Sequence, residues 1–189
     1  KIFSIKNSKF YFKFVKDYKK IKNQNVVFII NYTKILPKSF LIQNDLNLVV
    51  HASNLPKGKG FAPIQWEILN NKNKFNICLI KAEEKVDSGG VIEENFFYLK
   101  GHELNTEIRK IQADQTIKII KKFLKKYPKF KLTQQKGAST YFRRRQKKDS
   151  KLNVNKSLKS SFNLLRIVDN DKYPAFFEYK KKKYIIKIL

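Results

Sequence analysis

The stretch HASNLPKGKGFAPIQWEILN, residues 51–70, decides how this chain is expected to fold. It begins with the last residue of a short apolar run, residues 46–51, and such a run is typical of a strand covered on both faces. A loop with one proline and two glycines follows, and Pro63 then opens a helix that extends to Leu69. A buried strand followed by a loop and a helix is the repeating unit of α/β proteins.

The rest of the chain continues this alternation of strands and helices. Residues 102–127 form the longest predicted helix, because apolar residues such as Leu104, Ile108 and Ile111 recur every three to four positions. We therefore expect an α/β fold whose sheet is at least partly parallel. The other predicted strands are residues 10–15, 25–30, 75–80 and 91–99, and the other predicted helices are residues 37–43 and 158–168. Residues 175–179 and 184–188 are expected to pair as a hairpin with a basic tip.

Two loops stand out as candidate ligand sites. One follows His51 and the other precedes Gly89 and Gly90, and each comes after a predicted strand. In α/β sheets, ligands bind at the carboxyl ends of strands. We therefore expect the two loops to border one cleft.

The chain is strongly basic, which raises the question of a polyanionic partner. Its 42 Lys and Arg residues exceed its 15 Asp and Glu residues, for a formal net charge of +27. Lysine is spread along the whole length and outnumbers arginine, whereas bidentate phosphate recognition favours arginine. Nucleic-acid binding is therefore a minor alternative, and the charge is expected at most to steer a phosphorylated substrate.

Other features bear on the compartment and on the ends of the chain. The single cysteine, Cys78, lies in an apolar run and is expected to be a buried, reduced thiol. No apolar stretch approaches the roughly 20 residues of a membrane span, so a cytoplasmic protein without a membrane partner is the default. The chain starts at Lys1 and contains no methionine, so we expect a trimmed N-terminus.

Two residues are candidates for proton-transfer chemistry. His51 stands at the end of a buried strand, although a lone histidine there is more often a satisfied core or capping residue. Asp87 precedes Ser88 and two glycines, where an aspartate is most simply a turn residue. The sequence has no Cys/His cluster for a metal and neither a phosphate-binding GxxxxGK[ST] nor a GxSxG motif.

Taken together, these two segments resemble the two signature motifs of the folate-dependent N-formyltransferase family. Residues 51–70 are similar to the family pattern His-x-Ser-x-Leu-Pro-x-x-Arg-Gly followed by Ala-Pro and a helix, and EEKVDSGG, residues 83–90, to its second motif, Asp-Thr/Ser-Gly. INYTKILPK, residues 30–38, looks like the strand and loop beside the family's folate pocket. Residues 139–153 and 163–179 resemble the segment that follows the catalytic domain in sugar-modifying members.

The resemblance implies a Rossmann-like catalytic domain over residues 1–130, incomplete at its N-terminus, and a small α+β subdomain over residues 131–189. It implies 10-formyltetrahydrofolate as formyl donor, His51 as the group that moves the proton, and Asp87 as the carboxylate that holds the imidazole. The residues it places at the folate site are Ser53, Asn54, Leu55, Pro56, Glu83, Glu84, Lys85, Val86, Tyr32 and Ile35.

One departure from the family pattern bears directly on catalysis. The asparagine that stabilises the oxyanion two positions before the family's histidine is replaced by Val49. The loss of one oxyanion donor typically costs about 2.7–4 kcal/mol of transition-state stabilisation. Either another amide substitutes, with Asn47, Asn54 and Gln65 as candidates, or the protein is slow or inactive. Two milder departures are Lys59 and Phe61, which stand where relatives carry arginine.

The resemblance leaves the formyl acceptor open. The short C-terminal segment favours an amino sugar attached to a nucleotide, as used in surface polysaccharide synthesis. Methionyl-tRNA formyltransferase is an alternative, as is a formyltransferase fold whose chemistry is impaired by Val49. The remaining hypothesis is an unrelated basic nucleic-acid-binding protein in which the two motifs occur by coincidence. The oligomeric state is unknown, with a homodimer left open.

Overall fold

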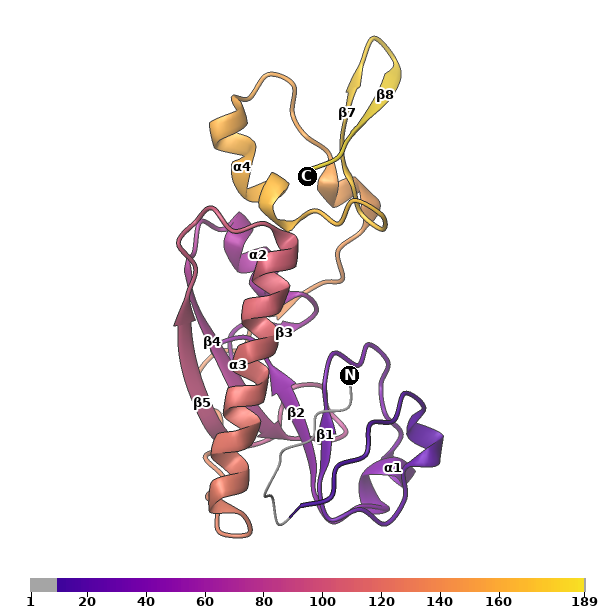
Figure 1. Ribbon diagram of the computed structural model, residues 1–189, viewed down its shortest axis with the longest axis vertical. Helices are drawn as coiled ribbons and strands as arrows, with labels where there is room; N and C mark the ends of the chain where they lie inside the picture. The colour runs from indigo at the N-terminus through magenta and orange to yellow at the C-terminus, as the bar shows by residue number, and fades with distance from the viewer. Residues whose placement is uncertain (1–9, 189) are drawn as a thin grey trace.

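The computed structural model describes residues 10–188, which are built around one four-stranded sheet (Figure 1). Its strands are β1 (Val27–Ile29), β2 (Asn47–His51), β4 (Lys74–Lys81) and β5 (Val91–Tyr98), in the order β1-β2-β4-β5. β1 is parallel to β2, whereas β2 and β4, and β4 and β5, are antiparallel. The predicted α/β fold with a partly parallel sheet is confirmed.

Two helices cover one face of the sheet and form the main core with it. These are α2 (Pro63–Leu69) and the long α3 (Asn105–Lys126), which runs along the strands in Figure 1. Alternate strand residues such as Leu48 and Leu79 point into this core, where Ile119 and Phe123 of α3 are completely buried. Val50 of β2 packs against this core, so the next residue, His51, lies on the opposite face of the sheet.

The remaining elements are short: the first and last α-helices and the C-terminal hairpin lie close to their predicted ranges, whereas the two 3₁₀ helices and a two-stranded ladder were not predicted. The 3₁₀ helix η1 (Tyr18–Lys20) and α1 (Lys38–Ile42) precede β2, and the small ladder of β3 (Lys59–Gly60) with β6 (Tyr141–Phe142) lies beside the sheet. The C-terminal part contains η2 (Lys147–Ser150), α4 (Leu158–Ile167) and the hairpin of β7 (Ala175–Tyr179) and β8 (Lys182–Ile186). Within residues 10–188, no helix is long and apolar enough to cross a membrane.

The prediction of a strand at residues 10–15 was wrong. These residues form no ladder; Phe10 and Phe12 instead pack their rings against the main core, and Phe10 also meets Tyr127 edge to face. Alternating aromatic and basic residues satisfy a strand pattern, but the same alternation also fits an extended segment outside any strand, in which Phe10 and Phe12 pack on the core while Phe14 stays 79% exposed.

The strand directions also correct how the two candidate loops meet. Each loop follows the carboxyl end of its own strand, but those ends lie at opposite edges of the sheet because β4 runs antiparallel to β2. Lys81, at the end of β4, pairs with Leu48, whereas His51 pairs with Cys78, three positions or about 10 Å back along β4. The loop of residues 82–90 must therefore fold back over the sheet to bring Asp87 to His51.

The C-terminal part is joined to the sheet by a buried guanidinium. Arg166 of α4 is 1% exposed, its Nη2 lies 3.4 Å from Glu103 Oε2, and it also donates to the Glu103 carbonyl and to Asn73 Oδ1. Apolar residues of this part, among them Leu152, Val168 and Ala175, form a smaller core of their own. The predicted division at residue 130 stays a prediction.

We expect Arg166→Met to lower the free energy of unfolding by about 3 kcal/mol, because it leaves Glu103 buried without its cation. Urea denaturation measures this loss. Lys159→Met, on the exposed face of the same helix, is the matched control and should change stability little. Equal stability of the two variants would contradict the structural role given to Arg166.

Gly60 provides a second test, in the ladder between β3 and β6. Its φ is +94°, and a Cβ there would lie 2.4 Å from the Phe142 carbonyl oxygen, whereas Gly137 has a similar φ of +101° and nothing within 4 Å. Gly137→Ala should therefore cost only the left-handed strain of about 1–2 kcal/mol. Gly60→Ala should cost clearly more in thermal unfolding, and a similar loss for both would contradict the close approach.

Candidate active site

His51 is held in one orientation at the end of β2. Its ring is 7% exposed, and Nε2 lies 2.9 Å from the carbonyl oxygen of Gly58, in the loop that follows. A carbonyl oxygen can only accept, so Nε2 carries the hydrogen and donates it. On its other side the ring presents Nδ1, which has a free lone pair whenever the ring is neutral.

Asp87 faces that other side of the ring. Its Oδ2 lies 3.6 Å from His51 Nδ1 and accepts a hydrogen bond of 2.9 Å from the backbone N–H of Gly60. The distance to Nδ1 is too long for a hydrogen bond, but a proton on Nδ1 would be attracted by the carboxylate. The structure thus brings together two residues that are 36 positions apart, as the two sequence motifs predicted.

This arrangement defines what the pair can do chemically. It can hold an imidazolium against a carboxylate, which is the charge pattern of a general acid and base. Because Nε2 already donates to Gly58, transfer of its proton to another molecule requires that bond to be exchanged for one to the incoming atom.

The ten residues predicted for the folate site lie in three loops with different exposures. Ser53 is fully buried, and its Oγ has no hydrogen-bond partner in the described part of the chain. Leu55 and Pro56 are half-buried, while Asn54 and residues 83–86 are exposed. Tyr32 is half-buried against Tyr18, and Ile35 is 76% exposed. Their role in folate binding stays a prediction.

The space around Val49 is apolar. Val49 and Leu55 pack on the cluster of Cys78, Ile80 and Val91, on the same sheet face as His51. Asn47 is committed elsewhere: its Nδ2 donates to the carbonyl of Leu41.

Sequence reasoning missed one buried amide on the His51 face, that of Asn76. It lies two residues before Cys78 in β4 and is 4% exposed. Its Nδ2 makes two contacts of 3.5 Å, to Asn54 Oδ1 and Glu94 Oε2, and its Oδ1 is unpartnered within residues 10–188. A polar residue inside an otherwise apolar run was the available signal. His51 pairs with Cys78 and Val49 with Ile80, so Asn76 and Val49 lie on opposite sides of His51 along the strands.

Two further residues were missed; they follow α3, in a segment for which no helix or strand was predicted. Gln135 donates from Nε2 to the carbonyl oxygens of Asp87 (2.9 Å) and Gly89 (2.8 Å). Thr140 accepts at Oγ1 from the backbone N–H of Gly58 at 2.8 Å. Nothing local in the sequence marks either residue.

The thiol of Cys78 is a structural neighbour of the site. It is free, and burial raises the pKa of Cys78, so the thiol stays protonated. Sγ donates to the carbonyl oxygen of His51 at 3.3 Å. It helps to hold the end of β2 and is a poor nucleophile. Among residues 10–188, no three His, Cys, Asp or Glu side chains gather in a way that could hold a metal ion.

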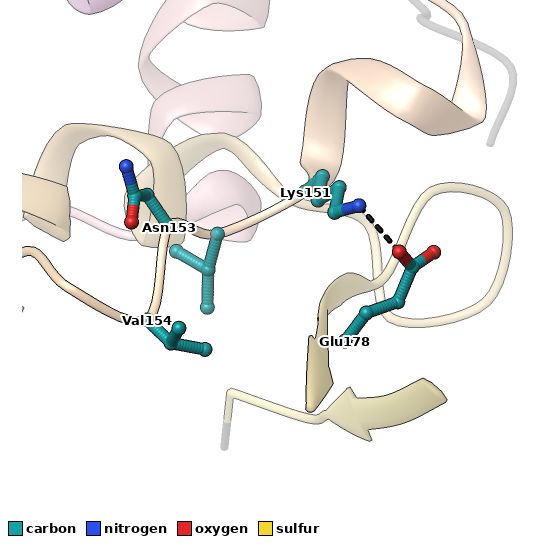
Figure 2. Close-up of a pocket in the computed structure, with 5 residues that line it drawn as sticks. Lys151, Asn153, Val154 and Glu178 are labelled. Carbon is teal, nitrogen blue, oxygen red and sulfur yellow. Dashed lines mark hydrogen bonds and ion pairs between the residues drawn. The ribbon is translucent and has the colours of Figure 1, made fainter. Parts of the chain in front are cut away.

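A cavity of about 340 Å³ lies away from this site, in the C-terminal part (Figure 2). Its lining residues are Lys151, Leu152, Asn153, Val154 and Glu178, and Figure 2 shows the ion pair between Lys151 and Glu178. It contains neither His51 nor Asp87. The two charged residues of its lining, Lys151 and Glu178, are paired with each other.

The sequence of the chain matches a family model and known proteins. The family model described as formyl transferase matches residues 5–124. The chain is 32% identical over 157 residues to methionyl-tRNA formyltransferase of Thermodesulfovibrio yellowstonii, an alignment that covers 78% of this chain and 50% of that protein. The chain thus spans about half the length of that curated relative.

Solved structures share the fold at lower identity. A sugar N-formyltransferase from Shewanella has a TM-score of 0.71 and 16% identity, covering 87% of this chain and 69% of that one. HypX from Aquifex aeolicus in complex with tetrahydrofolic acid has a TM-score of 0.68 and 14% identity, covering 84% of this chain and 28% of that one. Because the family model spans well over half of the residues and includes both His51 and Asp87, the chain belongs to the formyl transferase family.

Proposed function

We propose that this chain transfers a formyl group from 10-formyltetrahydrofolate to a primary amine. The observation that carries the proposal is the buried His51, with Asp87 3.6 Å from Nδ1 and a single acceptor, Gly58 O, on Nε2. The solved relative that contains tetrahydrofolic acid, with its shared fold, supports the donor.

In the proposed reaction, the amine nitrogen bonds to the formyl carbon, and the bond from that carbon to the folate nitrogen breaks. The amine loses one proton and the leaving nitrogen gains one. His51 carries this proton, and Asp87 stabilises the imidazolium while it does so. Burial of the pair strengthens their attraction relative to water.

For the acceptor, we favour the amine of a nucleotide-linked amino sugar. The support is the small C-terminal part, whose residues 139–153 and 163–179 resemble those of sugar-modifying members. The excess of positive charge fits a phosphorylated substrate. The free, buried Cys78 is compatible with the reducing cytoplasm that we infer as its location.

Methionyl-tRNA is the second candidate acceptor, because the 32% identical relative carries that name. The salt dependence of binding distinguishes the two candidate acceptors. Binding of tRNA would weaken steeply with salt, since each neutralised phosphate contributes to the salt slope. A sugar nucleotide with two phosphates would show a much shallower dependence.

We expect His51→Ala to reduce formyl transfer by about 10²- to 10⁴-fold, the usual contribution of a positioned acid–base group. The assay mixes the protein with 10-formyltetrahydrofolate and either amino-sugar nucleotides or methionyl-tRNA, and detects the formylated product by mass spectrometry. His102→Ala is the control, because His102 is the other histidine and is exposed. Full activity in His51→Ala would overturn the assignment.

The missing oxyanion amide yields a separate expectation. Val49→Asn should raise the turnover number by at least tenfold, since one such donor is typically worth about 10²- to 10³-fold and part will be lost to imperfect placement. Val49→Leu has nearly the same shape as asparagine without the amide and controls for repacking of the apolar cluster. No gain over Val49→Leu would mean that another donor already serves the oxyanion.

A further inference from the structure

The segment between α3 and the C-terminal part, residues 131–144, crosses the candidate site and is here called the strap. At its start, the backbone of Thr133 exchanges two hydrogen bonds of 2.8 Å with Val91 at the beginning of β5. At its end, β6 pairs with β3, which lies within the loop that joins His51 to α2. The strap therefore contacts both loops that carry the catalytic pair.

Gln135 fixes the loop of Asp87. Its Nε2 uses both hydrogens, on the carbonyl oxygens of Asp87 and Gly89, and the side chain is half-buried. Asp87 has a φ of +51°, in the left-handed region that residues with a Cβ adopt uncommonly, although aspartate does so more readily than most. The loop must also fold back across the sheet, and the two hydrogen bonds from the Gln135 amide hold the backbone on both sides of Ser88 in that position.

Thr140 fixes the partner of His51. Its Oγ1 accepts from the N–H of Gly58, and its backbone carbonyl accepts from Lys59 N–H at 2.9 Å. The carbonyl oxygen of Gly58 is the acceptor for His51 Nε2. A shift of the Gly58 residue would therefore move the group that sets which nitrogen of the imidazole carries the hydrogen.

We propose that Gln135 and Thr140 are positioning residues for the reaction, each acting on one member of the pair: Gln135 through Asp87, and Thr140 through Gly58 on His51. The inference rests on the proposed function, because it assigns a purpose to the geometry of that same site. Its physical basis is that a misplacement of about 1 Å at a reacting group can cost on the order of 10²-fold in rate.

The first test compares matched variants of the full chain in the formyl-transfer assay. Gln135→Met and Thr140→Val keep the side-chain shape and remove the hydrogen-bonding groups. Gln134→Met and Ser139→Ala alter exposed neighbours on the same strap and serve as controls. We expect kcat to fall 10- to 100-fold in the first two variants with KM for the formyl donor changed by less than threefold, and Thr140→Ser to regain most of the lost rate.

The second test does not require turnover. The chain has two histidines, so protein labelled with ¹⁵N-histidine gives two imidazole spin systems, and His51→Ala assigns them. We expect wild-type His51 in its neutral form to show the Nε2–H tautomer with a slowly exchanging proton. Thr140→Val should produce a mixture of His51 tautomers or fast exchange of the imidazole proton, while the signals of His102 stay unchanged. The control Ser139→Ala should leave the His51 signals and the melting temperature unchanged. An unaltered His51 signal in Thr140→Val would overturn the role of Thr140.

A double-mutant cycle decides whether Gln135 acts through Asp87. If it does, Gln135→Met should reduce the rate of Asp87→Asn by less than twofold, because the group it positions is already disabled. Full additivity of the two losses would instead mark Gln135 as a general stabilising residue. If the wild-type protein transfers no formyl group to any amine, the proposed function is wrong. The tautomer experiment would still show whether Thr140 positions the His51 imidazole.

Discussion

The antiparallel placement of β4 beside β2 is the constraint on which the site depends. In a fully parallel sheet, loops after neighbouring strands would meet at one edge without further help. Here the loop after β4 starts at the opposite edge from His51, since Lys81 lies beside Leu48. The carboxylate reaches the imidazole only because the loop returns over the sheet and is tied there by Gly60 and Gln135.

Local sequence patterns were sufficient for most of the elements. Pro63 at the first helical position placed the start of α2, and the apolar period placed α3 to within a few residues at each end. The strand expected at residues 10–15 failed because the same alternation fits an extended segment, in which Phe10 and Phe12 pack on the core and Phe14 stays exposed. The direction of each strand could not be read from the sequence either. The loop of residues 82–90 is compatible with an antiparallel hairpin of β4 and β5, but an apolar strand sequence fits a parallel and an antiparallel neighbour equally well.

The candidate site was predictable only in part, because sequence motifs indicate the reacting side chains but not the distant residues that contact them. The spacing of two motifs pointed to His51 and Asp87, which the fold brings together. The residues that hold them in place, Gln135 and Thr140, follow a 22-residue helix and occur in a polar segment without periodicity. Their contacts are long-range and depend on where that helix ends, so no local rule could have identified them.

The buried guanidinium of Arg166 has a consequence for the internal mobility of the molecule. Its bonds to Glu103 and Asn73 are directional and tolerate little sliding, unlike contacts between apolar side chains. The part of the molecule that carries α4 is thus expected to move together with the sheet.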